Sequence, residues 1–155
     1  MIRKNRNPCV LFLEDAFAES HAECLRRAGY PRVERLCTHF QDVKRKTLEQ
    51  SVKDPRIINF CDQHSWVLVT VDSNMSLTHC ELIKTTRVAI LATAHNHAED
   101  MAEWVDGLIA AKATIERHWK KFERPWCATF SRQGKVQIRH VAPDTKGRRT
   151  RPKEA

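Results

Sequence analysis

Val10-Leu11-Phe12-Leu13-Glu14-Asp15 is an apolar run that ends in two acids. A short run of this kind, bounded by polar residues, predicts a buried strand over residues 10–13. Apolar residues then recur at helical spacing from Phe17 to Ala28, and the following Gly29 is typical of a helix end. An alternating run at residues 32–37 predicts a second strand. Strand, helix and strand together indicate a β-α-β unit, which builds parallel sheets.

The middle of the chain continues this alternation. After a polar loop, Asp54-Pro55 has the residues of a helix start, with Asp54 as N-cap and proline at the first helical position. Residues 66–71 predict a second strong strand, residues 73–82 a short polar helix, and residues 87–92 another buried strand. The sequence therefore predicts an α/β fold with a central, mainly parallel sheet.

The C-terminal part has two further patterns. One amphipathic stripe from Met101 to Phe122 predicts a single long helix. Residues 126–130 and 135–141 alternate on either side of Arg132-Gln133-Gly134, which indicates a β-hairpin. Residues 143–155 are basic and poor in apolar residues, so we expect a disordered tail after one domain that covers residues 1–142.

Composition narrows the class of protein. Hydrophobic residues make up 41% of the 155-residue chain and charged residues 30%, which is an ordinary globular balance. No apolar run approaches the roughly 20 residues that a membrane helix needs, and the basic N-terminus lacks the apolar segment of a signal peptide. We therefore expect a cytoplasmic protein without a membrane partner. The six cysteines include no CxxC pair, which favours reduced thiols.

The net charge of +8, with histidine taken as neutral, is typical of chains that bind nucleic acid or anionic surfaces. Lys44-Arg45-Lys46 is a local concentration of this charge and precedes Asp54. It can serve as a phosphate-binding site for RNA, or it can be a solvated loop. Charge alone leaves both interpretations open.

The positions of certain acids are the most informative feature. Glu14 and Asp15 follow the first predicted strand, Asp72 follows residues 66–71, and Asp54 opens a helix. The carboxyl ends of parallel strands line the ligand-binding crevice of an open α/β sheet. Converging carboxylates repel one another unless a cation lies between them, and all-oxygen ligands favour Mg²⁺ or Mn²⁺. Each acid taken singly can instead be a turn residue or a helix cap.

Four short pieces of the chain, taken in this order, resemble the bacterial PIN-like family of small toxin-type ribonucleases. They are Leu11-Phe12-Leu13-Glu14-Asp15, Leu25 with Gly29, Asp54-Pro55-Arg56-Ile57, and Leu68-Val69-Thr70-Val71-Asp72. The resemblance extends over residues 9–141. It implies a three-layer α/β/α sandwich with a central mainly parallel sheet, followed by the long helix and the hairpin. It also implies Mg²⁺- or Mn²⁺-dependent hydrolysis of RNA phosphodiester bonds by a toxin that an antitoxin protein holds inactive.

The resemblance also assigns roles to residues. The metal ligands would be Glu14, Asp15, Asp54 and Asp72, and the last three of these would be the catalytic acids. The spacing to Gly29 places Glu14 at the family's first acid, whereas the strand pattern favours Asp15, so that choice stays open.

Thr70 and Ser73 flank Asp72 and can orient a carboxylate or a water molecule. Asn74 stands where the family often has a further acid and would contribute a neutral oxygen. That replacement supports an alternative, a catalytically degenerate PIN-like module that binds RNA or a protein partner. A third interpretation is a homodimer whose interface contains the tryptophans.

Overall fold

The computed structural model describes residues 7–40, 54–95 and 101–139. Six strands form one sheet in the order β2-β1-β3-β4-β5-β6. Their bounds are β1 Val10–Leu13, β2 Arg32–Arg35, β3 Val67–Thr70, β4 Ala89–Thr93, β5 Trp126–Phe130 and β6 Val136–Arg139. All neighbouring strands pair in parallel except β5 and β6, which form the antiparallel hairpin. The predicted α/β fold with a mainly parallel sheet is confirmed.

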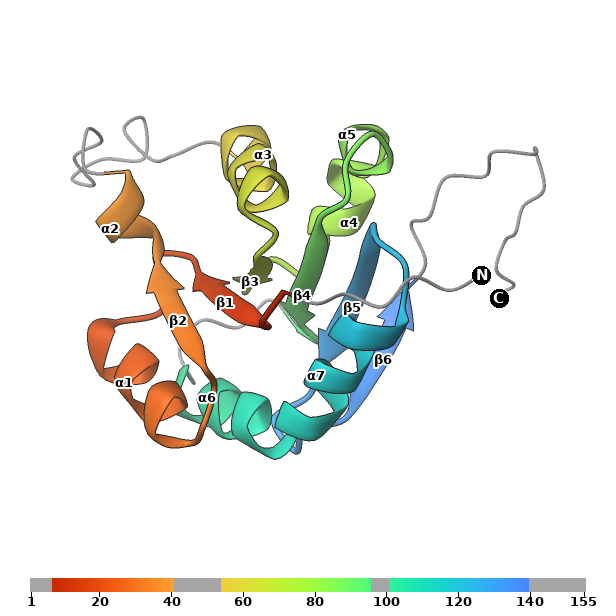
Figure 1. Cartoon of the computed structure of the whole chain (residues 1–155). Coiled ribbons are helices and arrows are strands. Elements are labelled where there is room, and N and C mark those ends of the chain that lie inside the picture. Colours follow the sequence, from red (N-terminus) through yellow and green to blue (C-terminus); the bar gives the residue numbers. More distant parts are fainter. Residues whose placement is uncertain (1–6, 41–53, 96–100, 140–155) are drawn as a thin grey trace.

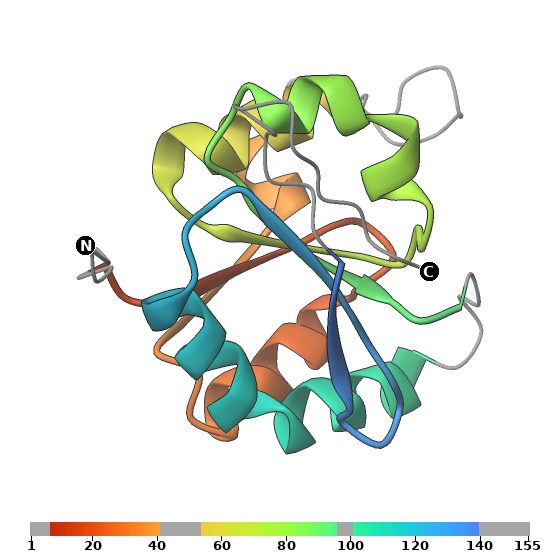
Figure 2. The same cartoon turned by 90° about the vertical axis from the view of Figure 1, so that its right-hand side faces the viewer.

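The helices cover both faces of this sheet, so the described part of the chain has three layers (Figures 1 and 2). One face carries α1 (Glu19–Arg27), α6 (Met101–Ala110) and α7 (Lys112–Lys121). The other face carries α3 (Asp54–His64), α4 (Met75–Thr78) and α5 (Cys80–Lys84), while α2 (Leu36–His39) extends from β2. Successive strand residues point to opposite faces: in β1, Leu11 belongs to the first core and Phe12 to the second.

The chain leaves β1 toward one edge of the sheet, to β2, and then returns past β1 to β3. The direction of winding therefore reverses between β1 and β3. In open α/β sheets, ligands bind outside the carboxyl ends of the strands at such a reversal. In this chain Glu14 follows β1 there, and Asp72 lies two residues beyond the end of β3.

The connection from β4 to β5 has an unusual hand. The steps from β3 to β4 and from β4 to β5 go in the same direction along the sheet. Their helices nevertheless lie on opposite faces, α4 and α5 on one and α6 and α7 on the other (Figure 1). Two such crossovers must have opposite hands, although nearly all β-α-β crossovers are right-handed. As a result α6 packs beside α1 and joins its core.

The prediction of one long helix over residues 101–122 is wrong. The segment forms two helices that meet at Ala111, where φ is −91° and ψ is 3°. The backbone bonds from Ala111 N–H to Gly107 O and from Ile115 N–H to Ala111 O, both 2.9 Å, survive the bend. Because of the bend, Trp104 and Trp119 both reach the same core.

Smaller predictions also need correction. The short helix expected at residues 73–82 is divided into α4 and α5, with His79 between them. Residues 36–39 are helical rather than part of a strand and loop. The helix expected at Asp54-Pro55 does begin at Asp54.

Burial tests the other expectations of the sequence. All four tryptophans lie in the core with exposed fractions of 7% or less, so they do not form the exposed interface of the third interpretation. All six cysteines are free. No helix among residues 7–40, 54–95 and 101–139 is long and apolar enough to cross a membrane. The basic Lys44-Arg45-Lys46 segment and the tail at residues 143–155 lie outside the described residues.

Candidate functional site

Glu14 lies at the end of β1, and its side chain is fixed to the end of β3. Its Oε1 accepts a hydrogen bond from the hydroxyl of Thr70 and another from the backbone N–H of Val71, both 2.8 Å long. The Glu14 N–H donates to Val69 O at 3.2 Å, which prolongs the pairing of the two strands. Thr70 is fully buried, while Glu14 and Val71 are half-buried.

The same hydroxyl connects Glu14 to Asp72. Thr70 Oγ1 accepts a hydrogen bond from the Asp72 N–H at 3.0 Å while it donates to Glu14. The Asp72 carboxylate in turn accepts from the Asn74 N–H at 3.0 Å, which fixes the turn that leads into α4. The carboxylates at the ends of β1 and β3 are therefore joined through one buried threonine.

Asp54 enters this region from the first turn of α3. Its Oδ2 lies 3.2 Å from His79 Nε2, and both side chains are partly exposed. A carboxylate oxygen only accepts hydrogen bonds, so Nε2 carries the proton in this pair. The contact orients Asp54 from the segment between α4 and α5.

The pKa of Glu14 shows that these acids interact. Burial raises it above its ordinary value, hydrogen bonds from Val71 and Thr70 act in the opposite direction, and the charges of Asp54 and Asp72 raise it further. The net shift is upward. Burial is the main reason why Glu14 is costly to ionise, and the two neighbouring carboxylates add to that cost, which a cation between the acids would offset. We call Glu14, Asp54 and Asp72 the acidic site.

The other residues predicted for this site include Asp15, Ser73 and Asn74, none of which is fully buried. Asp15 lies in the turn after Glu14 and its side chain is exposed. Ser73 is half-buried and Asn74 is exposed. The neighbouring Glu14 is hydrogen-bonded to the end of β3.

The donor set of the acidic site suits a hard divalent cation, because it consists of carboxylate oxygens. In the part of the chain that the structure describes, no three His, Cys, Asp or Glu side chains are arranged to hold a metal ion together as they stand. Glu14 Oε1 is directed toward Thr70 and Val71, while Asp54 is about one-third exposed.

Two residues of this region carry no distinctive sequence signal. His79 stands in a polar stretch seven residues after Asp72, with no spacing that marks it as a partner of Asp54. Thr93 ends β4, where its buried hydroxyl donates to His95 O at 2.6 Å and lies 3.2 Å from Val71 O. It connects the end of β4 to the residue whose N–H binds Glu14. The contact of His79 depends on where the helices lie over the sheet, and that of Thr93 depends on the strand order.

Comparison with known proteins gave no matching family model, no similar curated protein and no similar solved structure.

Proposed function

We propose that this chain is a metal-dependent ribonuclease of the PIN-like kind, with Glu14, Asp54 and Asp72 as the ligands of Mg²⁺ or Mn²⁺. The observation that carries the proposal is the position of Glu14. Glu14 lies where the direction of winding reverses between β1 and β3, and Thr70 and Val71 anchor its carboxylate. Its pKa is raised by burial and, to a smaller extent, by the charges of the other two acids. Burying a carboxylate beside two others is costly for a fold that gains nothing from it.

A divalent cation bound there supplies Lewis-acid chemistry, polarising a phosphate oxygen and lowering the pKa of a water molecule. The chain's own residues supply the arrangement. Thr70 holds Glu14 in one orientation, and His79, between α4 and α5, contacts and orients Asp54. The net charge of +8 attracts a polyanion to a site whose own acids would repel it.

The experiment is cleavage of labelled single-stranded and structured RNA with Mg²⁺ or Mn²⁺, with an EDTA control. Asp72→Asn is the decisive variant, because asparagine keeps an oxygen that accepts from the Asn74 N–H while the charge is lost. We expect metal-dependent cleavage by the wild type and none by Asp72→Asn. Glu14→Gln and Asp15→Asn form a matched pair of neighbouring substitutions, and we expect only the former to abolish cleavage.

The metal can also be tested without RNA. A cation that binds only the folded state stabilises it by roughly 2.7 kcal/mol at a hundredfold excess over Kd. Mg²⁺ or Mn²⁺ should raise the Tm of the wild type and leave that of Asp72→Asn unchanged. An equal rise in both proteins would place the metal elsewhere.

A second function is favoured by a specific observation. Asn74 is neutral and exposed, and the described residues hold no group of three ligands already in place. A degenerate PIN-like module that binds RNA or a protein without cleaving it fits these two facts. Folded wild-type protein that binds RNA but does not cleave it with either metal would establish this module. An antitoxin protein is a proposed partner of this chain whether it is a nuclease or a degenerate module.

A further inference from the structure

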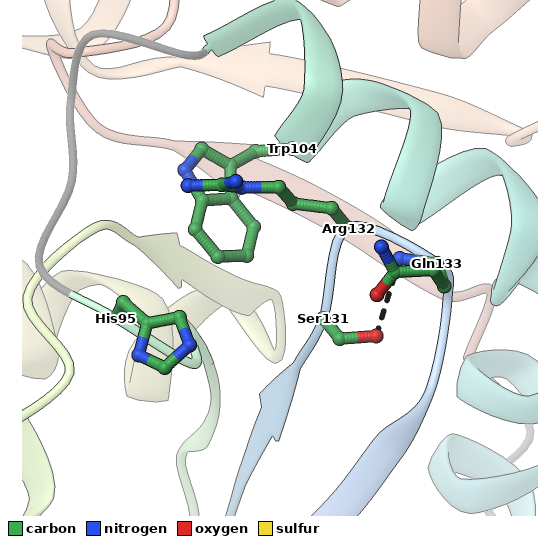
Figure 3. A pocket seen from close by; sticks show the side chains of 5 residues that line it. All are labelled: His95, Trp104, Ser131, Arg132 and Gln133. Carbon is green, nitrogen blue, oxygen red and sulfur yellow. Dashed lines mark hydrogen bonds between the residues drawn. The ribbon is translucent and has the colours of Figure 1, made fainter.

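A hollow lies beyond the carboxyl ends of β4 and β5, at the same end of the parallel strands as the acidic site. It has a volume of about 210 Å³. Figure 3 shows the side chains around it, which come from the end of β4, from α6 and from the β5–β6 turn. We call it the β4–β5 pocket; it is lined by His95, Trp104, Ser131, Arg132 and Gln133.

A planar cation forms one wall of this pocket. The guanidinium carbon of Arg132 lies over the ring of Trp104, 5.1 Å from its centroid, and the two groups overlap in the view of Figure 3. Arg132 Nη1 also lies 3.4 Å from Glu103 Oε1. Guanidinium planes held in this way stack on nucleobases. Because Glu103 offsets the charge of Arg132, the wall suits a neutral planar ring better than a phosphate.

Polar groups lie beside this wall. Ser131 Oγ accepts hydrogen bonds from the backbone N–H groups of Gln133 (3.2 Å) and Lys135 (3.0 Å), which directs its hydroxyl proton to another acceptor. The exposed Gln133 amide offers both donors and an acceptor. The exposed ring of His95 lies across the pocket from Arg132 (Figure 3). Such groups match the mixed donors and acceptors on the edge of a base.

The β5–β6 turn that carries this wall is held firmly. Ser131 N–H donates to Lys135 O at 2.9 Å and Gly134 N–H donates to Ser131 O at 3.0 Å. Two glycines bring the turn against α6: a Cβ on Gly107 would lie 2.2 Å from Ser131 O, and one on Gly134 would lie 2.6 Å from the Cβ of Ala110. Gly134 also has a φ of +89°. The turn that carries Ser131, Arg132 and Gln133 is therefore fixed against α6.

The pocket is close to the acidic site. Thr93 at the end of β4 connects His95 O to Val71 O, and the Val71 N–H binds Glu14. The ends of β3 and β5 are two strand spacings apart, about 10 Å. One RNA strand with a phosphodiester at the acidic site can therefore reach the pocket.

We propose that the β4–β5 pocket binds one nucleobase of the RNA strand whose backbone lies at the acidic site, with the base stacked on Arg132. This inference rests on the proposed function, since it takes RNA as the ligand. The base edge would meet Ser131 and Gln133. Such a pocket would select for unpaired strands, because a base within a duplex cannot enter it.

The test is the affinity for a short labelled single-stranded RNA in EDTA, measured by fluorescence anisotropy at several salt concentrations. Arg132→Lys keeps the positive charge and removes the planar guanidinium group. Arg139→Lys makes the same change at an exposed position near the start of β5, at the end of the strands away from the pocket. Loss of one stacked base should raise the Kd of Arg132→Lys about tenfold. Its salt dependence should match that of the wild type, because no ionic contact is lost. Arg139→Lys should bind like the wild type.

Two results would overturn the inference: wild-type affinity in Arg132→Lys, and failure of the wild type to bind RNA. In the first case, a shallower salt dependence in Arg132→Gln would identify Arg132 as a phosphate contact. Gln133→Ala is a second variant if Arg132→Lys does not fold, because it changes an exposed side chain. We expect it to weaken the affinity for RNA a few-fold. Cleavage is scored separately with Mn²⁺. If the wild type binds RNA but does not cleave it, and Arg132→Lys binds RNA about tenfold more weakly, the nuclease proposal fails and the base-binding pocket stands.

Discussion

Replacing the hydroxyl of Thr70 by a methyl group tests the geometry of the acidic site directly. In Thr70→Val the side chain keeps its shape, but Glu14 loses a 2.8 Å hydrogen bond and the Asp72 N–H loses its 3.0 Å acceptor. A hydrogen bond to a charged group contributes roughly 1.5–3 kcal/mol, and a buried N–H without a partner costs about 1–3 kcal/mol. Since the Val71 N–H still holds Glu14, we expect the lower end of both ranges. The free energy of unfolding should fall by about 2.5 kcal/mol.

Thr70→Ser is the matched control, because serine keeps the hydroxyl and loses only a methyl group. That loss should cost about 1 kcal/mol. Both variants are compared with the wild type by urea denaturation in EDTA, where a shift of the midpoint at constant slope reports a change in stability. In a Glu14→Gln background the cost of Thr70→Val should shrink, because a neutral acceptor gains less from the bond. Equal losses in Thr70→Val and Thr70→Ser would refute the role of the hydroxyl.

Three further predictions concern stability in metal-free buffer. Glu14→Gln should raise the Tm at neutral pH. The folded-state pKa of Glu14 lies above its ordinary value, so the stability that this group contributes is present at acid pH and is lost as the pH rises through the folded-state pKa. Glutamine is neutral at every pH and avoids that loss. The gain should therefore disappear in melts at acid pH. Gly107→Ala should lose about 2 kcal/mol in urea denaturation, because the overlap with Ser131 O outweighs a helix-propensity gain of about 1 kcal/mol. Tyr30→Phe removes a buried 2.6 Å bond to Leu108 O and should cost about 1 kcal/mol by the same measurement.

The sequence contained enough information for the sheet and for the ends of its first strands. Apolar runs of four or five residues identify β1, β3 and β4 because both faces of these strands are covered. An acid at the end of such a run then falls at the carboxyl edge wherever its strand lies. That is why the sequence alone predicts that Glu14 or Asp15 converges with Asp72, whereas Asp54 is added because it opens a helix between the two strands.

The contacts between these acids and their partners could not be obtained in the same way. The pairing of Asp54 with His79 depends on where α3 and the α4–α5 segment lie over one face of the sheet. The bend at Ala111 depends on the docking of α6 against the β5–β6 turn, since alanine itself favours a continuous helix. Periodicity reports which side of an element is apolar, and it contains no information about neighbouring elements.

The hand of the crossover from β4 to β5 is another feature that periodicity does not predict. With the usual hand, α6 would lie on the face of α3, and Trp104 would belong to the other core. Instead α6 packs beside α1, so Trp104 reaches the end of β5 and supports Arg132 there. The unusual hand thus creates the β4–β5 pocket beside the acidic site. If the pocket binds a base, this departure from the common topology has a functional reason. If Arg132→Lys binds RNA like the wild type, the crossover needs only the packing of α6 on α1 to explain it.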